Sequence, residues 1–337
     1  MGDVSIIIPT FRRPDLLRAA LESCLGQVGV DPAEVEIVVV DNCAQGSARQ
    51  AVAALAATSP AELVYVHEPR SGISHARNAG LAAARGAFVA FIDDDEVASA
   101  EWLSHLLGTR REHDADVVLA PVMPEIRADR DPAALGFYRD FFTYSADVPT
   151  GTELGSGVLT PFWSRGERAY PRLASGNALL RKACLADTRF DPRLGRTGGE
   201  DTLFFNQLLA DGARIVWCAE AIAREAVPED RLRLGYVLPR AFRGGQITSR
   251  TPLMLRRPRP MMTALAMAIG AVQLPVHLVA GAAGALVRAP RRYHHYAAAA
   301  TALGKLLWMP PFRRKVYGEA SGTPALGAAS PSGGSAQ

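Results

Sequence analysis

Cysteine is scarce in this sequence, with 4 residues in 337, and no two of them stand in a C-x-x-C spacing. They fall at positions 24, 43, 184 and 218, with no cluster of histidines around them. This pattern excludes a disulfide framework and a structural zinc site, and it fits a reducing compartment. The first apolar stretch, Val4 to Ile8, is too short for a secretory signal and follows no charged leader, so we expect no export.

Lysine is scarcer still, and acidic residues are missing from one long segment. There are 3 lysines against 34 arginines, as a GC-rich genome would give, so arginine abundance alone carries little information. Residues 231–318 contain 15 Arg or Lys and no Asp or Glu, whereas residues 1–230 contain 22 Arg or Lys and 33 acids. Because the cations of the basic segment alternate with apolar residues, we expect an anionic membrane surface as its partner and no nucleic acid.

Short apolar runs recur along the first 230 residues, with helical segments between them. The runs are residues 4–8, 36–40, 63–66, 88–92 and 117–120. This alternation predicts an α/β fold with a Rossmann-like, mostly parallel and buried central sheet. Helices are expected from Pro14, with Leu17, Leu21 and Leu25 on one face, and over residues 74–84 and 201–209. Residues 121–175 show no clear period and are interpreted as long loops.

Four consecutive acids, Asp93, Asp94, Asp95 and Glu96, follow the apolar run 88–92. Ligands of open α/β sheets gather beyond the carboxyl ends of the strands, where Thr10, Asp41 and His67 are also expected. Like charges packed this tightly favour a hard divalent cation, Mg²⁺ or Mn²⁺, that bridges a diphosphate. A solvated acidic turn ahead of a helix that begins near Ala100 is the alternative, and the run by itself leaves both open.

Three further motifs stand in a characteristic order around this run. They are Ser5-Ile-Ile-Ile-Pro9-Thr10-Phe-Arg12, Ile37-Val-Val-Val-Asp41-Asn42 and Gly72-Ile-Ser-His-Ala-Arg77-Asn78-Ala-Gly80. Over residues 3–245 the chain resembles the family 2 glycosyltransferases of the GT-A fold. Within that family it is most similar to bacterial enzymes that build exopolysaccharide or lipid-linked oligosaccharide, such as the succinoglycan glucosyltransferases.

The resemblance implies a role for each matching position. Pro9, Thr10 and Arg12 would line the nucleoside pocket, and Asp41 would accept a hydrogen bond from uracil. Its neighbour Asn42 stands where many relatives have a second Asp. The metal would be held by Asp95 together with Asp93, which would also hold the ribose, and the remaining residues of the donor site would be Asp94, Arg77 and Asn78. A guanidinium at Arg77 could meet a phosphate or an acid of the metal site, but it could also pair with a surface acid.

A second pair of acids lies far downstream, in Gly198-Gly199-Glu200-Asp201. Displacement with inversion at a sugar carbon needs a carboxylate that takes the proton of the acceptor hydroxyl. The resemblance gives this role to Asp201, with Glu200 in support. The alternative is that both acids only stabilise the first turn of a helix. Acceptor contacts are also considered for Trp163, for Ser175 to Asn177 and for Arg240 to Gln246.

The carboxy-terminal segment contains 27 consecutive uncharged residues, Met261 to Val287. As a helix this stretch is ~40 Å long, but arginine clusters at both ends disfavour a single crossing. We therefore expect a re-entrant or surface hairpin broken near Pro275. An Ala-rich hairpin packed on the enzyme domain or in a dimer interface is the alternative. Residues 319–337, rich in Gly, Ser, Ala and Pro, are expected to form a disordered tail.

Together these features predict a GT-A domain over residues 1–230 and a helical, membrane-associated appendage over residues 231–318. The predicted activity is inverting, metal-dependent transfer of a sugar from a UDP-sugar to a lipid-linked or polysaccharide acceptor in exopolysaccharide synthesis. The predicted location is the cytoplasmic face of the inner (plasma) membrane, peripheral or re-entrant. Two alternatives are a catalytically degenerate membrane assembly subunit and a nucleotidyltransferase, although the Gly-rich activating loop of the latter is missing.

Overall fold

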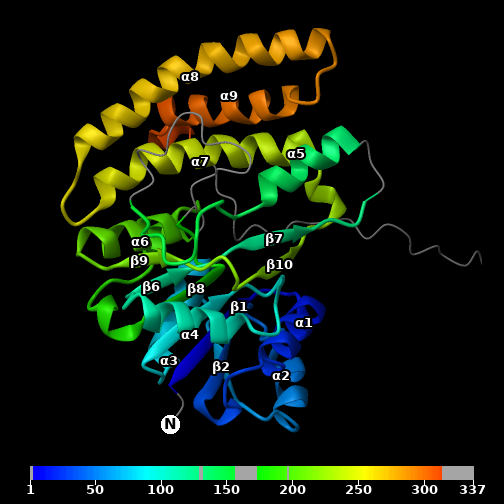
Figure 1. Ribbon diagram of the computed structural model, residues 1–337, viewed down its shortest axis with the longest axis vertical. Coiled ribbons are helices and arrows are strands. Elements are labelled where there is room, and N and C mark those ends of the chain that lie inside the picture. The colour runs from blue at the N-terminus through cyan, green and yellow to red at the C-terminus, as the bar shows by residue number, and fades with distance from the viewer. Residues whose placement is uncertain (1–2, 129–131, 156–172, 196, 313–337) are drawn as a thin grey trace, which may run out of the picture.

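The structure, a computed structural model, describes residues 3–128, 132–155, 173–195 and 197–312. Figure 1 shows a sheet domain covered by helices and, stacked over one end of it, a group of three longer helices. The predicted tail over residues 319–337 and the acceptor candidate Trp163 lie outside the described residues.

The central sheet has seven strands in the order β3-β2-β1-β4-β8-β6-β9. All neighbouring strands are parallel except β8, which runs antiparallel to both β4 and β6. This arrangement confirms the predicted α/β class with a mostly parallel sheet. The strands are β1 (Val4–Thr10), β2 (Val35–Asp41), β3 (Glu62–His67), β4 (Phe88–Ile92), β6 (Val117–Leu119), β8 (Asn177–Arg181) and β9 (Ile215–Trp217).

Helices bury both faces of this sheet, which is why β1 and β2 are apolar at nearly every position. Ile6 and Ile8 pack in one cluster and Ile7 in the other, as the alternation along a strand requires. One face is covered by α1 (Pro14–Leu25), α2 (Arg49–Ala56) and α4 (Trp102–Glu112), and the other by α3 (Ile73–Ala83) and α6 (Glu200–Ala210). A Cβ at Gly80 of α3 would collide with Ile7, so this helix approaches the sheet more closely than any larger residue allows.

The register of the strands brings the predicted site residues to one edge of the sheet, as expected. Thr10 lies opposite Asp41, and Asp41 lies opposite His67. Asp93 follows directly after β4, the other neighbour of β1. The acidic run and the ends of the first three strands therefore meet at one edge of the sheet.

The expectation of loops throughout residues 121–175 was wrong. Among the described residues of this range the chain forms β7 (Val122–Glu125) and α5 (Pro132–Phe142). Strand β7 belongs to a second sheet in the order β5-β10-β7, with β5 (Glu96–Ala98) and β10 (Ala223–Ala226). Its partner β10 comes about 100 residues later in the chain, so a local pattern could not reveal the pairing.

Three helices follow the sheet domain: α7 (Leu234–Met254), α8 (Pro260–Leu286) and α9 (Arg292–Leu306). Helix α9 packs against both α7 and α8, and α8 is the outermost of the three (Figure 1). The predicted break near Pro275 was wrong, because α8 continues through this proline and the chain reverses only after Leu286. A proline removes one backbone hydrogen bond, but α8 contacts α9 on both sides of it, at Gly270 and at Gly281, which offsets that loss.

Candidate functional site

The acidic run after β4 forms the centre of the candidate site. Thr10 Oγ1 donates a hydrogen bond to Asp94 Oδ2 at 2.8 Å, which ties the end of β1 to the run. The backbone N–H of Asp93 donates to Glu96 Oε2 at 3.0 Å and closes a tight turn. Asp94 and Glu96 are buried, whereas the side chain of Asp93 is 34% exposed. Asp93 is therefore the acid of the run that is most open to a ligand.

Two arginines that the sequence analysis did not single out contact the run. Arg13 Nη1 lies 3.2 Å from Asp94 Oδ1 and 2.9 Å from Asp95 Oδ2. Arg231 Nη2 lies 3.7 Å from Asp95 Oδ2, and its Nη1 lies 3.1 Å from Glu225 Oε1. The position of Arg13 directly after the Pro9-to-Arg12 motif was a usable signal. Arg231 reaches the site only through the second sheet, so the sequence offered no signal for it.

Glu225 is a further acid that the tertiary structure adds. It lies on β10, opposite Glu96 of β5 in the antiparallel register. Burial, followed by the charge of Asp95, raises the pKa of Glu225 to about 7. The sequence alone does not predict Glu225 as a site residue, because the pairing of β10 with β5 joins residues more than 120 positions apart.

Arg77 joins the two acidic motifs. Its Nη1 lies 2.8 Å from Glu200 Oε1 and its Nη2 lies 3.3 Å from Asp93 Oδ1. The guanidinium is buried and also lies 5.5 Å from the centre of the Phe190 ring. The structure thus brings together Asp93, Arg77 and Glu200, and it excludes the surface pairing that was the alternative for Arg77.

The candidate site holds more carboxylates than its arginines can neutralise. Burial raises the pKa of Asp94 to about 6, and burial together with the charge of Asp201 raises the pKa of Glu200 to about 7. Burial and the charge of Asp93 also raise the pKa of Asp95. Arg13 and Arg77 oppose these shifts without cancelling them, so each acid would ionise more readily beside an additional cation.

The residues of this edge fit a hard divalent cation, because the side-chain atoms that these acids offer as metal ligands are all carboxylate oxygens. Within the described part of the chain no three His, Cys, Asp or Glu side chains are arranged as a complete metal site. A cation that takes one or two carboxylates and completes its shell with substrate phosphates does not require three. Asp95 and Asp93 are the residues that would hold it.

A buried aspartate organises the loop after β2, where the nucleoside is expected. Asp41 accepts hydrogen bonds from the backbone N–H groups of Cys43 and Ala48, at 3.0 and 2.6 Å, and from Tyr65 Oη at 3.1 Å. Both carboxylate oxygens therefore hold the loop after β2. Arg12 lies beside this loop, with its Nη2 3.2 Å from Gln45 Oε1. Arg12 has a φ of 56°, and this turn directs its side chain to the Asp41 loop while Arg13 points to the acids.

Three other polar residues named from the sequence are engaged with backbone groups. Asn42 donates to the carbonyl oxygens of Glu68 and Arg70 and accepts from Gly72 N, so it fixes the loop that precedes α3. Asn78 exchanges two hydrogen bonds with the backbone of Phe190. Asn177 donates to two carbonyls inside the fold, and Pro9 is buried in β1. The side-chain amides of these residues do not reach the acidic run.

The loop before α6 positions the second acid pair. Gly198 and Gly199 have φ values of +79° and +90°, which larger residues rarely adopt. Arg250 of α7 donates to the carbonyl oxygen of Gly198 at 2.9 Å. Glu200 then points to Arg77, while Asp201 Oδ1 accepts from the backbone N–H of Thr202 at 2.6 Å. Helix α7 therefore fixes the backbone from which both acids project.

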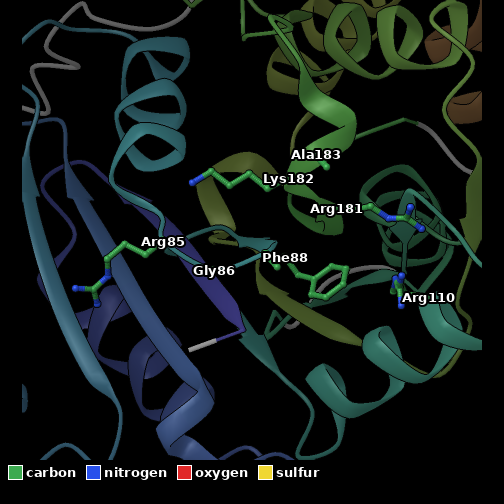
Figure 2. Close-up of a pocket in the computed structure, with 8 residues that line it drawn as sticks. Arg85, Gly86, Phe88, Arg110, Arg181, Lys182 and Ala183 are labelled. Carbon is green, nitrogen blue, oxygen red and sulfur yellow. The ribbon is translucent and has the colours of Figure 1, made fainter. Parts of the chain in front are cut away.

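A separate pocket lies at the opposite end of β4 and carries four cationic residues (Figure 2). The guanidinium of Arg85 points away from those of Arg110 and Arg181. Arg85 already pairs with Glu36, and Arg181 pairs with Asp114. The cations of this pocket neither converge nor face the acidic run, so we do not assign the reaction to it.

Comparisons with known proteins agree with this arrangement. Residues 5–149 match the family model Glycosyl transferase family 2. The succinoglycan biosynthesis protein ExoM of Rhizobium meliloti is 38% identical over 252 residues, which cover 73% of this chain and 74% of that protein.

Two solved structures share the fold. The mannosyltransferase PcManGT from Pyrobaculum calidifontis, in complex with GDP-Man and Mn²⁺, matches with a TM-score of 0.58 at 20% identity, over 91% of this chain and 87% of that one. TarS of S. aureus, in complex with UDP-GlcNAc, matches with a TM-score of 0.53 at 21% identity, over 80% and 71%. With its relatives, its sheet order and its acidic strand end, the chain belongs to glycosyltransferase family 2 and has the GT-A fold.

Proposed function

We propose that this protein is an inverting transferase that moves a sugar from a UDP-sugar to a lipid-linked or polysaccharide acceptor in exopolysaccharide synthesis, at the cytoplasmic face of the inner membrane. The observation that carries the proposal is the bridge Asp93–Arg77–Glu200, which joins the end of β4 to the start of α6. An inverting reaction needs the donor diphosphate and the acceptor base on opposite sides of one sugar carbon, and an arginine that contacts both acidic motifs supports such an arrangement.

On the donor side, Asp93 and Asp95 would hold Mg²⁺ or Mn²⁺. The rest of the donor site would be formed by Thr10, Arg12, Asp41, Asp94, Arg77 and Asn78. A bound divalent cation would neutralise charge on the diphosphate leaving group. Two proteins that share the fold, one in complex with UDP-GlcNAc and one with GDP-Man and Mn²⁺, support a nucleotide-sugar donor.

On the acceptor side, Asp201 would take the proton of the attacking hydroxyl. The acceptor oxygen then forms a bond to the anomeric carbon as the bond from that carbon to the diphosphate oxygen breaks, and UDP leaves. Glu200 stays in contact with Arg77 and positions this loop. The basic region 231–318 would keep the enzyme beside a lipid-linked acceptor.

The first experiment is a calorimetric titration of the detergent-purified protein with UDP, GDP and CDP, with and without Mn²⁺. We expect UDP to bind tightest and only with the metal, and we expect Asp95→Ala to lose this binding. Absence of binding by every nucleotide would overturn the proposal in favour of a catalytically degenerate assembly subunit. Tighter binding of GDP than of UDP would indicate that the donor is a GDP-sugar and not a UDP-sugar.

The second experiment is Asp201→Asn. A general base contributes about 10²- to 10⁴-fold, so transfer should fall by at least about 10²-fold while UDP binding stays unchanged. The matched control is Asp15→Asn, which also removes an acid from the first turn of a helix but lies exposed on α1. Full transfer activity in Asp201→Asn would exclude Asp201 as the base.

A further inference from the structure

Helix α8 has the reverse of the polarity expected for a helix on a water-soluble protein. Its buried positions include Thr263, Gln273 and His277, together with small residues such as Gly270. Several of its large apolar residues are strongly exposed, with Met261 84%, Val279 70% and Leu286 87% exposed. A surface helix in water directs its apolar stripe inward and its polar residues outward.

Most of the exposed large apolar residues of α8 form one stripe, with Leu278 beside it. Met261, Leu265, Val272, Val276, Val279 and Leu286 recur at intervals of three, four and seven positions, so they share one side of the helix. The buried positions Thr263, Ala266, Gly270, Gln273, His277 and Gly281 repeat with the same spacing on the opposite side. We call the exposed set the outer stripe of α8.

The inward polar groups find their partners within the protein. Thr263 Oγ1 donates to the carbonyl oxygen of Ser249 in α7 at 2.8 Å. Lys305 Nζ donates to Gln273 Oε1 at 3.0 Å, and His277 Nδ1 lies 3.1 Å from His295 Nδ1 in α9. Polar groups satisfied between helices and apolar groups turned outward are the arrangement that lipid, not water, stabilises.

The charges at the two ends of α8 indicate what covers the stripe. Arg257 and Arg259 precede the helix and Arg288 and Arg291 follow it, whereas the nearby Arg256 pairs with Asp211. Residues 231–318 contain no acid. A second copy of the chain packed on the stripe would bring these like charges together. An anionic bilayer would attract them, by ~1 kcal/mol for each cation near its surface.

Packing against α9 decides between lying on a bilayer and crossing it. Helix α9 runs along α8 from Gly270, which faces Lys305, to Gly284, which faces Arg292. Along this length the side of α8 that carries the outer stripe is left open. A crossing would carry Lys305, Arg292 and His295 of α9 into the hydrocarbon, where charged and polar groups are costly.

We propose that α8 lies in the plane of an anionic bilayer, with its outer stripe among the acyl chains, and does not cross the bilayer. This inference rests on the proposed function only in assigning the membrane as the location of the acceptor. Helix α7 contacts α8 through Ser249, and through Arg250 it contacts Gly198 in the loop before α6. The membrane surface would therefore lie one helix layer from the loop that carries Asp201.

The first test is flotation of the purified full chain with preformed vesicles of phosphatidylcholine, with and without phosphatidylglycerol. We expect binding that requires phosphatidylglycerol, and a loss of about a hundredfold in the partition coefficient for the double variant Val272→Glu/Val279→Glu. The matched control, Leu16→Glu/Val28→Glu, changes two exposed apolar residues of the sheet domain and should float like the parent chain.

Several outcomes of this test would overturn the proposal. Undiminished flotation of Val272→Glu/Val279→Glu would exclude the outer stripe as the lipid contact. A chain that fails to float but dimerises through α8, with the variant monomeric, would assign the stripe to a second copy. Unchanged thermal unfolding and UDP binding of the variant separate a loss of membrane contact from misfolding, and they also separate failure here from failure of the proposed transferase activity.

The second test distinguishes the in-plane arrangement from a crossing. Pro258 and Pro290 are exposed at opposite ends of α8, and changing them preserves the flanking arginines. In proteoliposomes of the double variant Pro258→Cys/Pro290→Cys, a membrane-impermeant maleimide should add two labels or none to each molecule, relative to the parent chain, as counted by intact mass spectrometry. A population with one added label would show a crossing and overturn the proposal.

Discussion

The sheet domain and the helical region of this protein are stabilised in opposite ways. The sheet domain buries carboxylates and offsets them with arginines such as Arg13 and Arg77. The helical region has no carboxylate of its own, and its helices meet at glycines, with large apolar residues turned outward. Charge compensation is thus the characteristic source of stability in the region where a charged substrate is expected. Close backbone packing is the characteristic source in the region where lipid is expected.

Removing Arg77 should destabilise the sheet domain, because it removes the charge compensation described above. Arg77→Met leaves the buried Glu200 and the partly exposed Asp93 without their shared cation. The expected cost is about 3 kcal/mol, near the low end for breaking a buried pair, because Asp93 reaches solvent and Glu200 can take up a proton. We expect a clear fall in the melting temperature and a loss of transfer. Calorimetry and a transfer assay would measure the two effects.

The control for this variant is Arg18→Met, which removes an exposed arginine from α1 and should change neither property. Arg77→Lys should recover part of the stability, because it restores the charge without the two-pronged geometry. A melting temperature of Arg77→Met equal to that of the parent chain would show that charge compensation does not stabilise this site.

Adding a methyl group at a helix contact should destabilise the closely packed helical region. A Cβ at Gly245 of α7 would collide with the carbonyl oxygen of Thr301 in α9, so Gly245→Ala should cost about 1–3 kcal/mol. The neighbouring Gly244 has open space, and Gly244→Ala should stabilise α7 by up to ~1 kcal/mol. Thermal unfolding in detergent should therefore give shifts of opposite sign, and equal shifts would contradict close packing of α7 on α9.

The smallest effect is expected at a charge pair remote from the site. Burial alone would raise the pKa of Glu36, but hydrogen bonds from Ser5 and Arg85 outweigh it and hold the pKa below its ordinary value. Because the folded pKa is the lower one, the stabilisation is present above the ordinary value, about 4.3, and is lost as the pH falls through the folded pKa.

Urea unfolding of Glu36→Gln at a series of pH values would measure this contribution. The variant should be less stable than the parent chain at neutral pH, and the difference should shrink as the solution is acidified below the ordinary pKa. Glu34→Gln, at an exposed position two residues earlier, is the matched control. A stability difference that stays constant down to low pH would show that the ionised form of Glu36 is not what stabilises the fold.

Much of the fold could be predicted because its signals are local. The apolar runs predicted β1, β2 and β4, since strands buried on both faces are apolar throughout. They also predicted β3, which lies at the edge of the sheet and is only partly buried. The second sheet could not be predicted in this way. Its three short strands come from distant parts of the chain, and β5 contains only Glu96, Val97 and Ala98. Pairing across such distances leaves no period in the sequence.

The site divides in the same manner. The motifs identified Asp93 and Arg77, and the structure brings them into contact. They could not identify Glu225 or Arg231, which reach the acidic run only because β10 pairs with β5. Asp41 was predicted to face the nucleoside, and the structure adds that its carboxylate holds the following loop.

By itself, the sequence determined the class of fold, the edge of the sheet where the acids lie and the division between an acidic and a basic region, because apolar period and charge are properties of neighbouring residues. Only the tertiary structure decided which arginine neutralises which acid, that α8 continues through Pro275, and that its polar side faces inward. Each of these depends on contacts between residues far apart in the chain, whose free energy no local pattern records.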